Sequence, residues 1–492
     1  MSTQNLHDAI YAGKGESPAL SVPGGVRLSY AELERAAAAM SIALAKRGVV
    51  RGDRVSFLAE KSLLVVILAH ACLRLGAVLH PLNTSYTDAE ISGLLADAEP
   101  RLLVGETAGA ERLAPLATAA GAGFATLDDL CMPVPGMPLP VADVAGHDTA
   151  AILYTSGTTG KPKGAMITHA NLAESARALA KVWRITPGDK LLHALPVFHA
   201  HGLLTALNTM LVAGGEVLFL PRFEAREVIA ALPSASVMMG VPTFYARLLK
   251  EPDIADAMQR MRVLISGSAP LPLELSEQFK RATGHRLIER YGSTEAAIIT
   301  AVPPGTDDRT GCVGWPLPGI ELRLIQAEGR RAERGIGVLE TRGHNVFSGY
   351  WRNPAADLEA FVDGGWFNTG DIAEIDAIGC VRLLGREKEL IITGGLNVYP
   401  KEVESVLDTL PGIETSAVFG VPHPDFGEAV VAAIETRAGA VFDETAAIGA
   451  ARVRLAAYKA PKRIVAVAEI PRNRMGKVDK KVLREAWKGM FG

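Results

Sequence analysis

One stretch of the chain, Tyr154-Thr-Ser-Gly-Thr-Thr-Gly-Lys-Pro-Lys-Gly164, limits most strongly what the rest can be. It follows the apolar run Ala150–Tyr154, which predicts a buried strand, and it precedes Thr168, a candidate helix N-cap. Glycines let a backbone approach a ligand closely, and N–H groups, hydroxyls and lysines can then hold phosphate oxygens. The stretch therefore predicts a loop for a nucleotide triphosphate, with a flexible surface loop as the alternative. It is not the common P-loop, because Pro162 follows Lys161 where that motif needs Ser or Thr.

The size and charge of the chain bound its class. Its 492 residues exceed the roughly 250–300 at which one hydrophobic core stops growing, so about two to four domains are expected. The net charge of −3 gives no strong field to attract nucleic acid. Residues 451–492, however, hold twelve Lys and Arg against three Asp and Glu, a local net of +9. This basic tract predicts either a solvated face or a landing site for an anionic ligand.

No segment has the pattern of a leader or a membrane anchor. Met1–Asp8 has neither the basic nor the apolar part of a secretory leader. The longest apolar runs, such as Leu63–Cys72, are about half the length of a spanning helix, and this one includes His70. We therefore expect a cytoplasmic protein without a membrane partner.

Strand-like and helix-like segments alternate through the first three hundred residues. Such alternation predicts an α/β fold of parallel sheets with helices on both faces, here in two similar subdomains. Helices are expected at 28–49, at 63–76 and from Thr87, and strands at 52–58, 78–82, 190–195, 216–220 and 237–242. Residues 97–104 are expected to form a turn and a strand, and residues 263–271 a strand that runs into a turn.

The texture changes in the last third of the chain. From Gly311 to about residue 384, short strands and glycine-rich turns predict a β-rich subdomain. The following hundred residues have their own helix–strand alternation and the size of a domain. We expect a large N-terminal domain over 1–385, a hinge over 386–389 and a small mobile α+β C-terminal domain over 390–492.

Seven motifs occur in a fixed order along the chain. They are the segments 154–164, 195–202, 266–271, 289–295, 367–371, 385–401 and 471–477. With these motifs, the chain resembles, from about residue 20 to its end, the adenylate-forming acyl-CoA synthetases, the superfamily that also holds firefly-type luciferases and the adenylation domains of peptide synthetases. The resemblance implies that superfamily's fold and a two-step reaction. A carboxylate attacks the α-phosphorus of ATP to give an acyl-adenylate and pyrophosphate, and the coenzyme A thiolate then displaces AMP.

The resemblance also implies which residues hold ATP and Mg²⁺. Glu295 corresponds to the Mg²⁺ carboxylate, a hard oxygen ligand, and Thr294 to a phosphate-binding residue. Asp371 and Arg386 correspond to the pair that holds the ribose hydroxyls, and Tyr291 to the residue that stacks on adenine. The other positions implied in the nucleotide site are Thr155, Ser156, Gly157, Thr158, Thr159, Lys163 (or Lys161), Gly267, Ser268, Ala269, Pro270, Glu289, Arg290, Gly292 and Ser293.

Further matches concern the alternation between the two steps. Lys477 corresponds to the family's catalytic lysine, which would neutralise charge on the carboxylate and the α-phosphate. Lys388 corresponds to the hinge about which the C-terminal domain rotates between half-reactions. In the family, this rotation withdraws the lysine and brings Gly394 and Gly395 to line the coenzyme A tunnel. One more solvated lysine remains the plain alternative for Lys477.

Arg290 says most about the acid. A pocket for a fatty or aryl acid should be apolar, and a buried arginine without a partner is costly there. A dicarboxylate offers a second carboxylate for its guanidinium. The motif Glu289-Arg-Tyr-Gly292, together with 81–86, 193–202 and 239–245, resembles malonyl-CoA synthetases. This implies that Arg290, His199 and Ser268 hold the distal carboxylate of malonate.

Several alternatives stay open. Arg290 could simply pair with Glu289, and Ser293 with the apolar Ala296–Ile299 departs from the usual family pattern, which leaves room for methylmalonate. The chain could be a ligase for another short-chain or aryl acid, or an adenylation enzyme that loads a separate carrier protein. A non-catalytic relative is disfavoured by the intact motifs. The histidines near 193–201 lack a zinc-binding pattern. We expect small-molecule substrates and no obligate protein partner.

Overall fold

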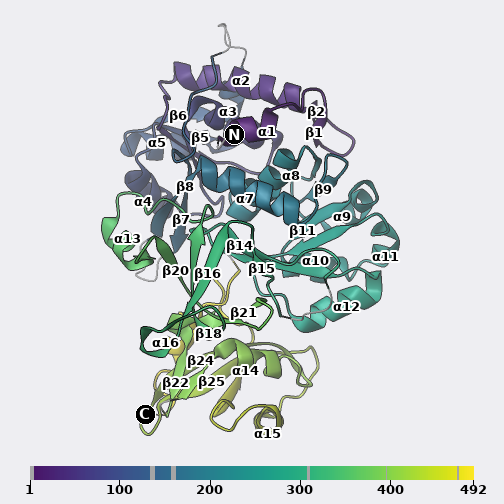
Figure 1. The fold of residues 1–492 in the computed structure, drawn as a ribbon, viewed down its shortest axis with the longest axis vertical. Coiled ribbons are helices and arrows are strands. Elements are labelled where there is room, and N and C mark those ends of the chain that lie inside the picture. Colours follow the sequence, from purple (N-terminus) through teal and green to yellow (C-terminus); the bar gives the residue numbers. More distant parts are fainter. Residues whose placement is uncertain are drawn as a thin grey trace. The chain divides into compact units, whose positions relative to one another are not determined.

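The computed structural model describes residues 5–132, 139–156, 162–306, 311–394, 396–473 and 476–491. The chain divides into two compact units, Met1–Leu322 with Thr341–Phe367, and Arg323–Glu340 with Asn368–Gly492. Figure 1 labels many of the helices and strands of both units. The boundaries inferred from the sequence, with a hinge over 386–389, stay a prediction.

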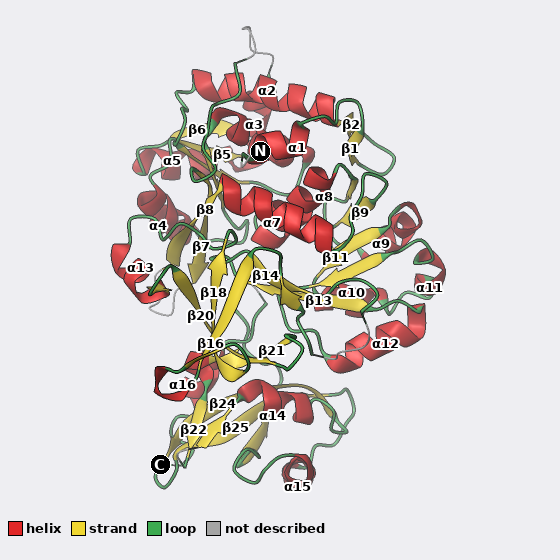
Figure 2. Cartoon of the chain, in the orientation of Figure 1, coloured by secondary structure: helices red, strands yellow, loops and turns green. Residues whose placement is uncertain are grey.

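The first unit holds two sheets whose strands alternate along the chain with helices, as the sequence predicts (Figure 2). In one sheet, five strands run parallel and β8 returns antiparallel to β7. Strands such as β4 and β5 are buried at every position, which is typical of parallel strands covered on both faces. Its spatial order is β6 (Gly123–Thr126), β5 (Leu102–Gly105), β3 (Arg54–Leu58), β4 (Val78–Pro81), β7 (Thr149–Ser156) and β8 (Pro162–Thr168).

The other sheet of this unit has nine strands. Its centre is parallel, and the antiparallel strands β2, β14 and β15 lie at its ends. The order is β15 (Trp315–Pro316), β14 (Ile298–Ala301), β13 (Leu287–Gly292), β12 (Val263–Ser266), β11 (Val237–Gly240), β9 (Lys190–His193), β10 (Glu216–Phe219), β1 (Pro18–Ser21) and β2 (Arg27–Ser29).

Several helices of the first unit begin where the sequence carries capping signals. Ser29, Thr87 and Thr168 each form a capping box with the third residue of the helix that follows. Gly76 ends α3 with a φ of 66°, a left-handed conformation that favours glycine. The α-helices of the first unit, listed with the π-helix η2, are α1 (Leu6–Tyr11), α2 (Tyr30–Lys46), α3 (Leu63–Leu75), α4 (Asp88–Ala98), α5 (Ala110–Ala119), α6 (Leu127–Cys131), α7 (His169–Val182), η2 (His201–Leu207), α8 (Asn208–Ala213), α9 (Ala225–Ala231), α10 (Pro242–Leu248), α11 (Ile254–Ala257), α12 (Leu273–Thr283) and α13 (Pro354–Ala360).

The second unit is built on a sheet whose long antiparallel pair, β24 and β25, lies beside β22 and the parallel β26. Leu407 and Ile434 belong to one apolar cluster of this unit, and Phe419 and Leu483 to another. The elements are β22 (Ile391–Thr393), β23 (Leu396–Val398), α14 (Pro400–Leu407), β24 (Ile413–His423), β25 (Gly427–Thr436), α15 (Glu444–Arg454), β26 (Arg463–Ala466) and α16 (Lys480–Trp487).

The β-rich texture predicted between residues 311 and 384 is confirmed. Three of its strands contribute residues to both units. Its strands, after β15, are β16 (Ile320–Ile325), β17 (Arg331–Ala332), β18 (Gly335–Gly343), β19 (Phe361–Val362), β20 (Trp366–Ile375) and β21 (Val381–Arg386). Across the described ranges of both units, no helix is long and apolar enough to span a bilayer.

Candidate active site

Most of the predicted ligand-binding residues of the first unit follow the carboxyl ends of parallel strands. Strands β9, β11, β12 and β13 are neighbours and parallel, so the segments after them meet at one edge of the sheet, where ligands of α/β sheets bind. His199 and His201 follow β9, and Gly267–Pro270 follows β12. Glu289–Gly292 lies in β13, and Ser293, Thr294 and Glu295 come directly after it. The sequence therefore selects one edge of one sheet.

Both ends of the predicted phosphate loop lie in paired antiparallel strands, β7 and β8, which we call the phosphate hairpin. Thr155 in β7 lies opposite Lys163 in β8. The interpretation of 154–164 as one loop between a strand and a helix was wrong at Lys163, because pairing with β7 makes residues 162–168 a strand. Gly157, Thr158, Thr159 and Lys161 lie outside the described residues, and so does the side chain of Ser156.

Glu295 meets the phosphate hairpin directly. Its Oε1 accepts hydrogen bonds from Thr155 Oγ1 at 3.0 Å and from the hydroxyl of Tyr350 at 3.2 Å. Two segments that the sequence assigns to phosphate and metal binding are therefore in contact. Thr294 is half-buried beside Glu295.

The surroundings of Glu295 suit Mg²⁺. Within the described part of the chain, no group of three His, Cys, Asp or Glu side chains is close enough to form a cage of protein ligands. Mg²⁺ usually binds one or two carboxylates together with substrate phosphates and water. A single half-buried carboxylate beside a phosphate loop fits this mode of binding.

Lys163 and Tyr350 form a second contact of this region. The ammonium of Lys163 lies 5.2 Å from the centroid of the Tyr350 ring and 3.6 Å from Glu359 Oε2. The sequence analysis did not select Tyr350. The one local feature that could have drawn attention to it is its position between Gly349 and Trp351, within the predicted β-rich stretch.

Arg290, Ser268 and His201 meet at the edge of the other sheet. Ser268, in a left-handed conformation with a φ of 68°, hydrogen-bonds with His201 Nδ1 at 3.0 Å through its Oγ. Arg290 Nη2 donates to the same Oγ at 3.4 Å. The contact of Arg290 with Ser268 agrees with the sequence-based grouping. The histidine in contact with Ser268 is His201, whereas the ring of His199 lies 4.5 Å from that of Phe198.

Gly267 and Gly202 allow this close approach. A Cβ on Gly267 would lie 2.4 Å from Arg290 Nε, so the guanidinium rests against the bare backbone. A Cβ on Gly202 would lie 2.0 Å from the carbonyl oxygen of Pro196, so only glycine fits the tight turn beside His201. The sequence alone did not identify His201 as the partner of Ser268. The tight turn at Gly202 determines which of the two histidines in His199-Ala-His201 reaches Ser268, and a sequence does not display this turn.

These residues belong to a wider group of basic side chains, which we call the basic cluster. Its members are Lys61, His193 and His201, which are buried, and Arg290, which is partly buried. Lys61 Nζ donates to the carbonyl oxygen of His193 at 2.8 Å and lies 4.3 Å from the centroid of the Phe219 ring. His193 Nε2 donates in turn to the carbonyl oxygen of Gly202. Sequence reasoning gave no reason to select Lys61.

Burial dominates the electrostatics of the basic cluster. It lowers the pKa values of Lys61, His193 and His201 well below their usual ranges, with a further lowering of the His201 pKa by Arg290. Burial also lowers the pKa of Arg290 to about 10, so the guanidinium stays charged at neutral pH. Among the described residues, neither His201 Nε2 nor Arg290 Nε has a hydrogen-bond partner. Arg290 is therefore a partly buried cation with donor capacity left for an anion.

The residues that the family resemblance implies around the nucleotide, Tyr291 among them, make ordinary local contacts. Tyr291 is buried in β13, and Glu289 Oε1 accepts a hydrogen bond from the backbone of Leu271. Ala269 and Pro270 are exposed in the turn after β12, and Ser293 Oγ accepts from the backbone of residue 296. Their roles toward adenine stay predictions.

The second unit brings together the predicted ribose pair. Asp371 in β20 lies opposite Arg386 in β21, and Arg386 Nε is 2.8 Å from Asp371 Oδ1. Arg386 Nη1 also donates to the carbonyl oxygen of Thr369 at 3.0 Å. The carboxylate of Asp371 is buried, and the guanidinium of Arg386 is half exposed.

Lys477 follows a tight turn of the same unit. Its backbone N–H donates to Asn473 Oδ1 at 3.1 Å, and Gly476 before it has a φ of 75°. The side chain of Lys477 is exposed.

The residues assigned to the hinge and to coenzyme A also lie in this unit. Lys388 is in the 3₁₀ turn η5 (Glu387–Glu389), and its carbonyl oxygen accepts a hydrogen bond from Arg484 in α16 at 3.2 Å. Gly394 donates from its backbone to Phe426 at 2.8 Å, whereas Gly395 lies outside the described residues.

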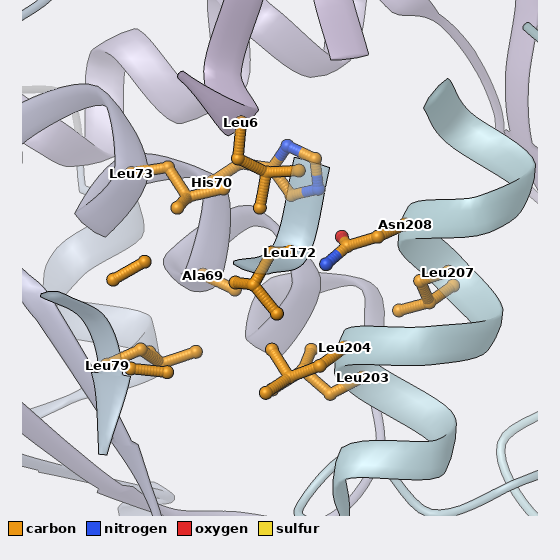
Figure 3. A pocket seen from close by; sticks show the side chains of 12 residues that line it. Leu6, Ala69, His70, Leu73, Leu79, Leu172, Leu203, Leu204, Leu207 and Asn208 are labelled. Atoms are coloured by element: carbon orange, nitrogen blue, oxygen red, sulfur yellow. The ribbon is translucent and has the colours of Figure 1, made fainter. Parts of the chain in front are cut away.

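A small pocket elsewhere in the first unit is not the acid site. Its volume is about 20 Å³, which is room for about one water molecule. Figure 3 shows His70 and Asn208 among a set of aliphatic side chains. The pocket is too small and too apolar for a carboxylic acid.

Comparison with known proteins decides the family. The model of the AMP-binding enzyme family matches residues 8–351, and that of the AMP-binding enzyme C-terminal domain matches residues 402–477. The chain belongs to the AMP-binding enzyme family. The fold expected from the sequence, that of acyl-adenylate synthetases, is thereby confirmed.

Relatives of this AMP-binding enzyme include ligases for different acids. A mitochondrial malonate–CoA ligase of Mus musculus is 36% identical, with 89% of this chain and 82% of that protein covered. A feruloyl-CoA synthase of Amycolatopsis is 34% identical, with 94% of each chain covered. The crystal structure of ATP-bound MatB from Rhodopseudomonas palustris is 42% identical over the whole of both chains, with a TM-score of 0.95.

These findings establish the class of reaction. The AMP-binding enzyme is an AMP-forming acid–thiol ligase, which uses ATP, Mg²⁺ and coenzyme A.

Proposed function

We propose that this ligase activates malonate, converting malonate, ATP and coenzyme A to malonyl-CoA, AMP and pyrophosphate through malonyl-adenylate. One observation carries the proposal: Arg290 keeps a charged, partly buried guanidinium in the basic cluster, and no acidic side chain is among its described hydrogen-bond partners. A buried cation is costly unless an anion joins it. The distal carboxylate of malonate is such an anion and suits a guanidinium.

The distal carboxylate would be held at the edge of the nine-stranded sheet. Arg290 and Ser268 would donate to it, together with a histidine. His201, which contacts Ser268 at 3.0 Å, is the better-supported histidine, and His199 two residues earlier remains the second candidate. With one carboxylate held there, the other is free to react.

In the first half-reaction, an oxygen of the reacting carboxylate attacks the α-phosphorus, and the bond to the pyrophosphate oxygen breaks. Lys477 would neutralise the two approaching anions. Mg²⁺ bound at Glu295 would lower the charge of the triphosphate. The remaining nucleotide contacts in this proposal come from Thr155, Ser156, Gly157, Thr158, Thr159, Lys163 and Thr294 at the phosphates, from Gly267, Ala269, Pro270, Glu289, Tyr291, Gly292 and Ser293 around adenine, and from Asp371 and Arg386 at the ribose.

In the second half-reaction, the coenzyme A thiolate attacks the acyl carbon, and AMP leaves with the oxygen that joined it to the acyl group. We infer that rotation about Lys388, in the hinge 386–389 between domains 1–385 and 390–492, exchanges Lys477 for Gly394 and Gly395. Two reactions with different needs can share one site in this way.

The proposal also concerns which other acids the site accepts. Ala296, Ile298 and Ile299 are buried and apolar, and this wall follows the metal carboxylate directly in the sequence. An apolar wall tolerates a methyl group better than a polar wall that must keep its hydrogen bonds. We therefore propose methylmalonate as a second, poorer substrate.

A panel of acids tests the proposal. Malonate, methylmalonate, succinate, acetate, benzoate and ferulate are each supplied with ATP and Mg²⁺, and pyrophosphate release is followed with and without coenzyme A. We expect the highest kcat/KM for malonate and formation of malonyl-CoA. A higher kcat/KM for acetate, benzoate or ferulate would refute malonate as the substrate. Pyrophosphate release without any acyl-CoA would favour an adenylation enzyme that loads a carrier protein.

A further inference from the structure

Residues 347–351 join two parts of the nucleotide site that are distant in the sequence. The backbone N–H of Phe347 donates to the carbonyl oxygen of Glu295 at 2.8 Å. Four residues later, the backbone N–H of Trp351 donates to the carbonyl oxygen of Gly164 at 2.7 Å, next to Lys163 in β8. The segment is therefore fixed at one end to the backbone of Glu295, the residue of the predicted metal carboxylate, and at the other to the backbone of β8 in the phosphate hairpin.

Tyr350 lies within this segment and uses its side chain in two ways. Its hydroxyl donates to Glu295 Oε1 at 3.2 Å, and its ring face lies 5.2 Å from the ammonium of Lys163. The ring is 8% exposed and packs edge-on against Phe347. A buried ring held by its neighbours can place both groups with little freedom.

The hydroxyl has an orienting effect that the ring lacks. The terminal torsion of a glutamate has only a broad, two-fold preference, so hydrogen bonds decide how the carboxylate faces. Oε1 of Glu295 accepts from both Thr155 and Tyr350. With one oxygen held by two hydroxyls, the rotation of the carboxylate is restricted.

The contact of the Tyr350 ring with Lys163 also supports a positioning role. The ion pair of Lys163 with Glu359 is 3.6 Å long, and the side chain of Glu359 is 74% exposed. Exposed pairs of this kind are weak, so an anionic phosphate can replace Glu359 at little cost. The Tyr350 ring then remains beside the lysine as a cation–π contact.

We propose that Tyr350 is a positioning residue for the first half-reaction, which holds the Glu295 carboxylate with its hydroxyl and guides Lys163 with its ring. The inference rests on the proposed metal-binding role of Glu295 and is independent of which acid is used. Tyr350 would thereby couple metal binding to the grip on the leaving phosphates.

The test measures ATP binding by titration calorimetry, with no acid or coenzyme A present, in Mg²⁺ and again in EDTA. In the wild type, ATP should bind more tightly with Mg²⁺. Tyr350→Phe keeps the ring and removes the hydroxyl, so we expect about a tenfold loss of affinity in Mg²⁺ and less than a twofold loss in EDTA. Tyr350→Leu also removes the cation–π contact and should weaken binding in EDTA by about threefold.

Tyr30→Phe is the matched control. The Tyr30 hydroxyl is also buried and donates to the backbone of residues 211 and 215. This variant should lower thermal stability about as much as Tyr350→Phe and leave ATP binding unchanged in both buffers. A purely structural role for Tyr350 would give the two variants the same binding behaviour and would overturn the inference.

A double variant separates orientation of Glu295 from other effects. If Tyr350 acts through Glu295, adding Tyr350→Phe to Glu295→Gln should cost less than a further twofold in Mg²⁺, because coupled changes are not additive. An undiminished tenfold loss in the double variant would overturn the inference. So would a Glu295→Gln enzyme whose ATP binding responds to Mg²⁺ as the wild type does. Neither result would change the acid preference, which the panel of acids measures separately.

Discussion

Replacement of Arg290 by methionine gives the sharpest test of the acid site. Methionine keeps much of the length and removes the charge. The guanidinium now lies against Gly267 and donates to Ser268 at 3.4 Å, while its Nε has no hydrogen-bond partner among the described residues. The variant therefore removes a cation whose best partner would be the substrate.

The size of the effect follows from the structure. Hydrogen bonds to charged groups contribute about 1.5–3 kcal/mol each, and loss of a guanidinium–carboxylate pair should cost about 3 kcal/mol of transition-state binding. Malonate kcat/KM should fall roughly 100-fold. Burial lowers the pKa of Arg290 from 12.5 to about 10, which corresponds to about 3 kcal/mol spent on holding the charge. Since part of the side chain is accessible, we expect Arg290→Met to gain about 1–2 kcal/mol of stability.

The assay compares malonate with propionate, which has a methyl group where malonate has its second carboxylate. Arg290→Met should lose malonate activity and keep or gain propionate activity, and its urea-unfolding midpoint should rise. An equal loss for both acids, or a clear loss of stability, would refute the reasoning.

Gly267→Ala is the matched variant for this test. Its Cβ would lie 2.4 Å from Arg290 Nε, and the end of an arginine side chain can move aside without unfolding the chain. The KM for malonate should rise about tenfold with little change in stability. An unchanged KM would mean that the position of the guanidinium does not matter to malonate.

Three further predictions concern adenylation, nucleotide binding and acid stability. Lys477→Ala should lower the rate of pyrophosphate release roughly 100-fold or more, while thioester formation from supplied malonyl-adenylate continues. An equal loss of both steps would contradict domain alternation. Asp371→Asn, which breaks the 2.8 Å pair with Arg386, should raise the KM for ATP about tenfold and leave that for malonate unchanged; a rise for malonate alone would remove the pair from the nucleotide site. Burial lowers the pKa values of His70 and His80 from 6.5 to about 3. Below pH 6.5 the unfolded chain therefore binds more protons than the folded chain. The stability that the neutral rings provide above pH 6.5 is lost as the pH falls toward 3. At pH 5 the two should together cost about 4 kcal/mol, which urea unfolding followed by tryptophan fluorescence at pH 7.5 and 5 measures; equal midpoints would contradict burial of the neutral rings.

Local signals in the sequence were sufficient for several elements. The capping boxes at Ser29, Thr87 and Thr168 begin α2, α4 and α7. The long apolar run Leu63–Cys72 lies in helix α3, and short apolar runs such as those of β11 and β12 become strands. These features depend on neighbours within a few residues, which a sequence displays directly. The order of the motifs was also sufficient for the family, since each motif fixes a piece of the same chemistry.

The phosphate hairpin shows where local reasoning fails. Lys161-Pro-Lys-Gly164 has the composition of a loop, yet residues 162–164 belong to a strand because they pair with β7. Strand pairing depends on a partner, and propensity is a weak guide when a partner is present.

The sequence by itself determined, through its motifs, that this is an adenylate-forming α/β enzyme. The family motifs selected Ser268 and Glu295, and Arg290 was selected both by its motif and by the cost of a buried charge without a partner. Only the tertiary structure decided what these residues touch. It brought His201 to Ser268 through the tight turn at Gly202, and it placed Tyr350 between Glu295 and Lys163. The physical reason is that side-chain types show which interactions are possible, whereas contacts between distant segments form only when the sheets pack and pair.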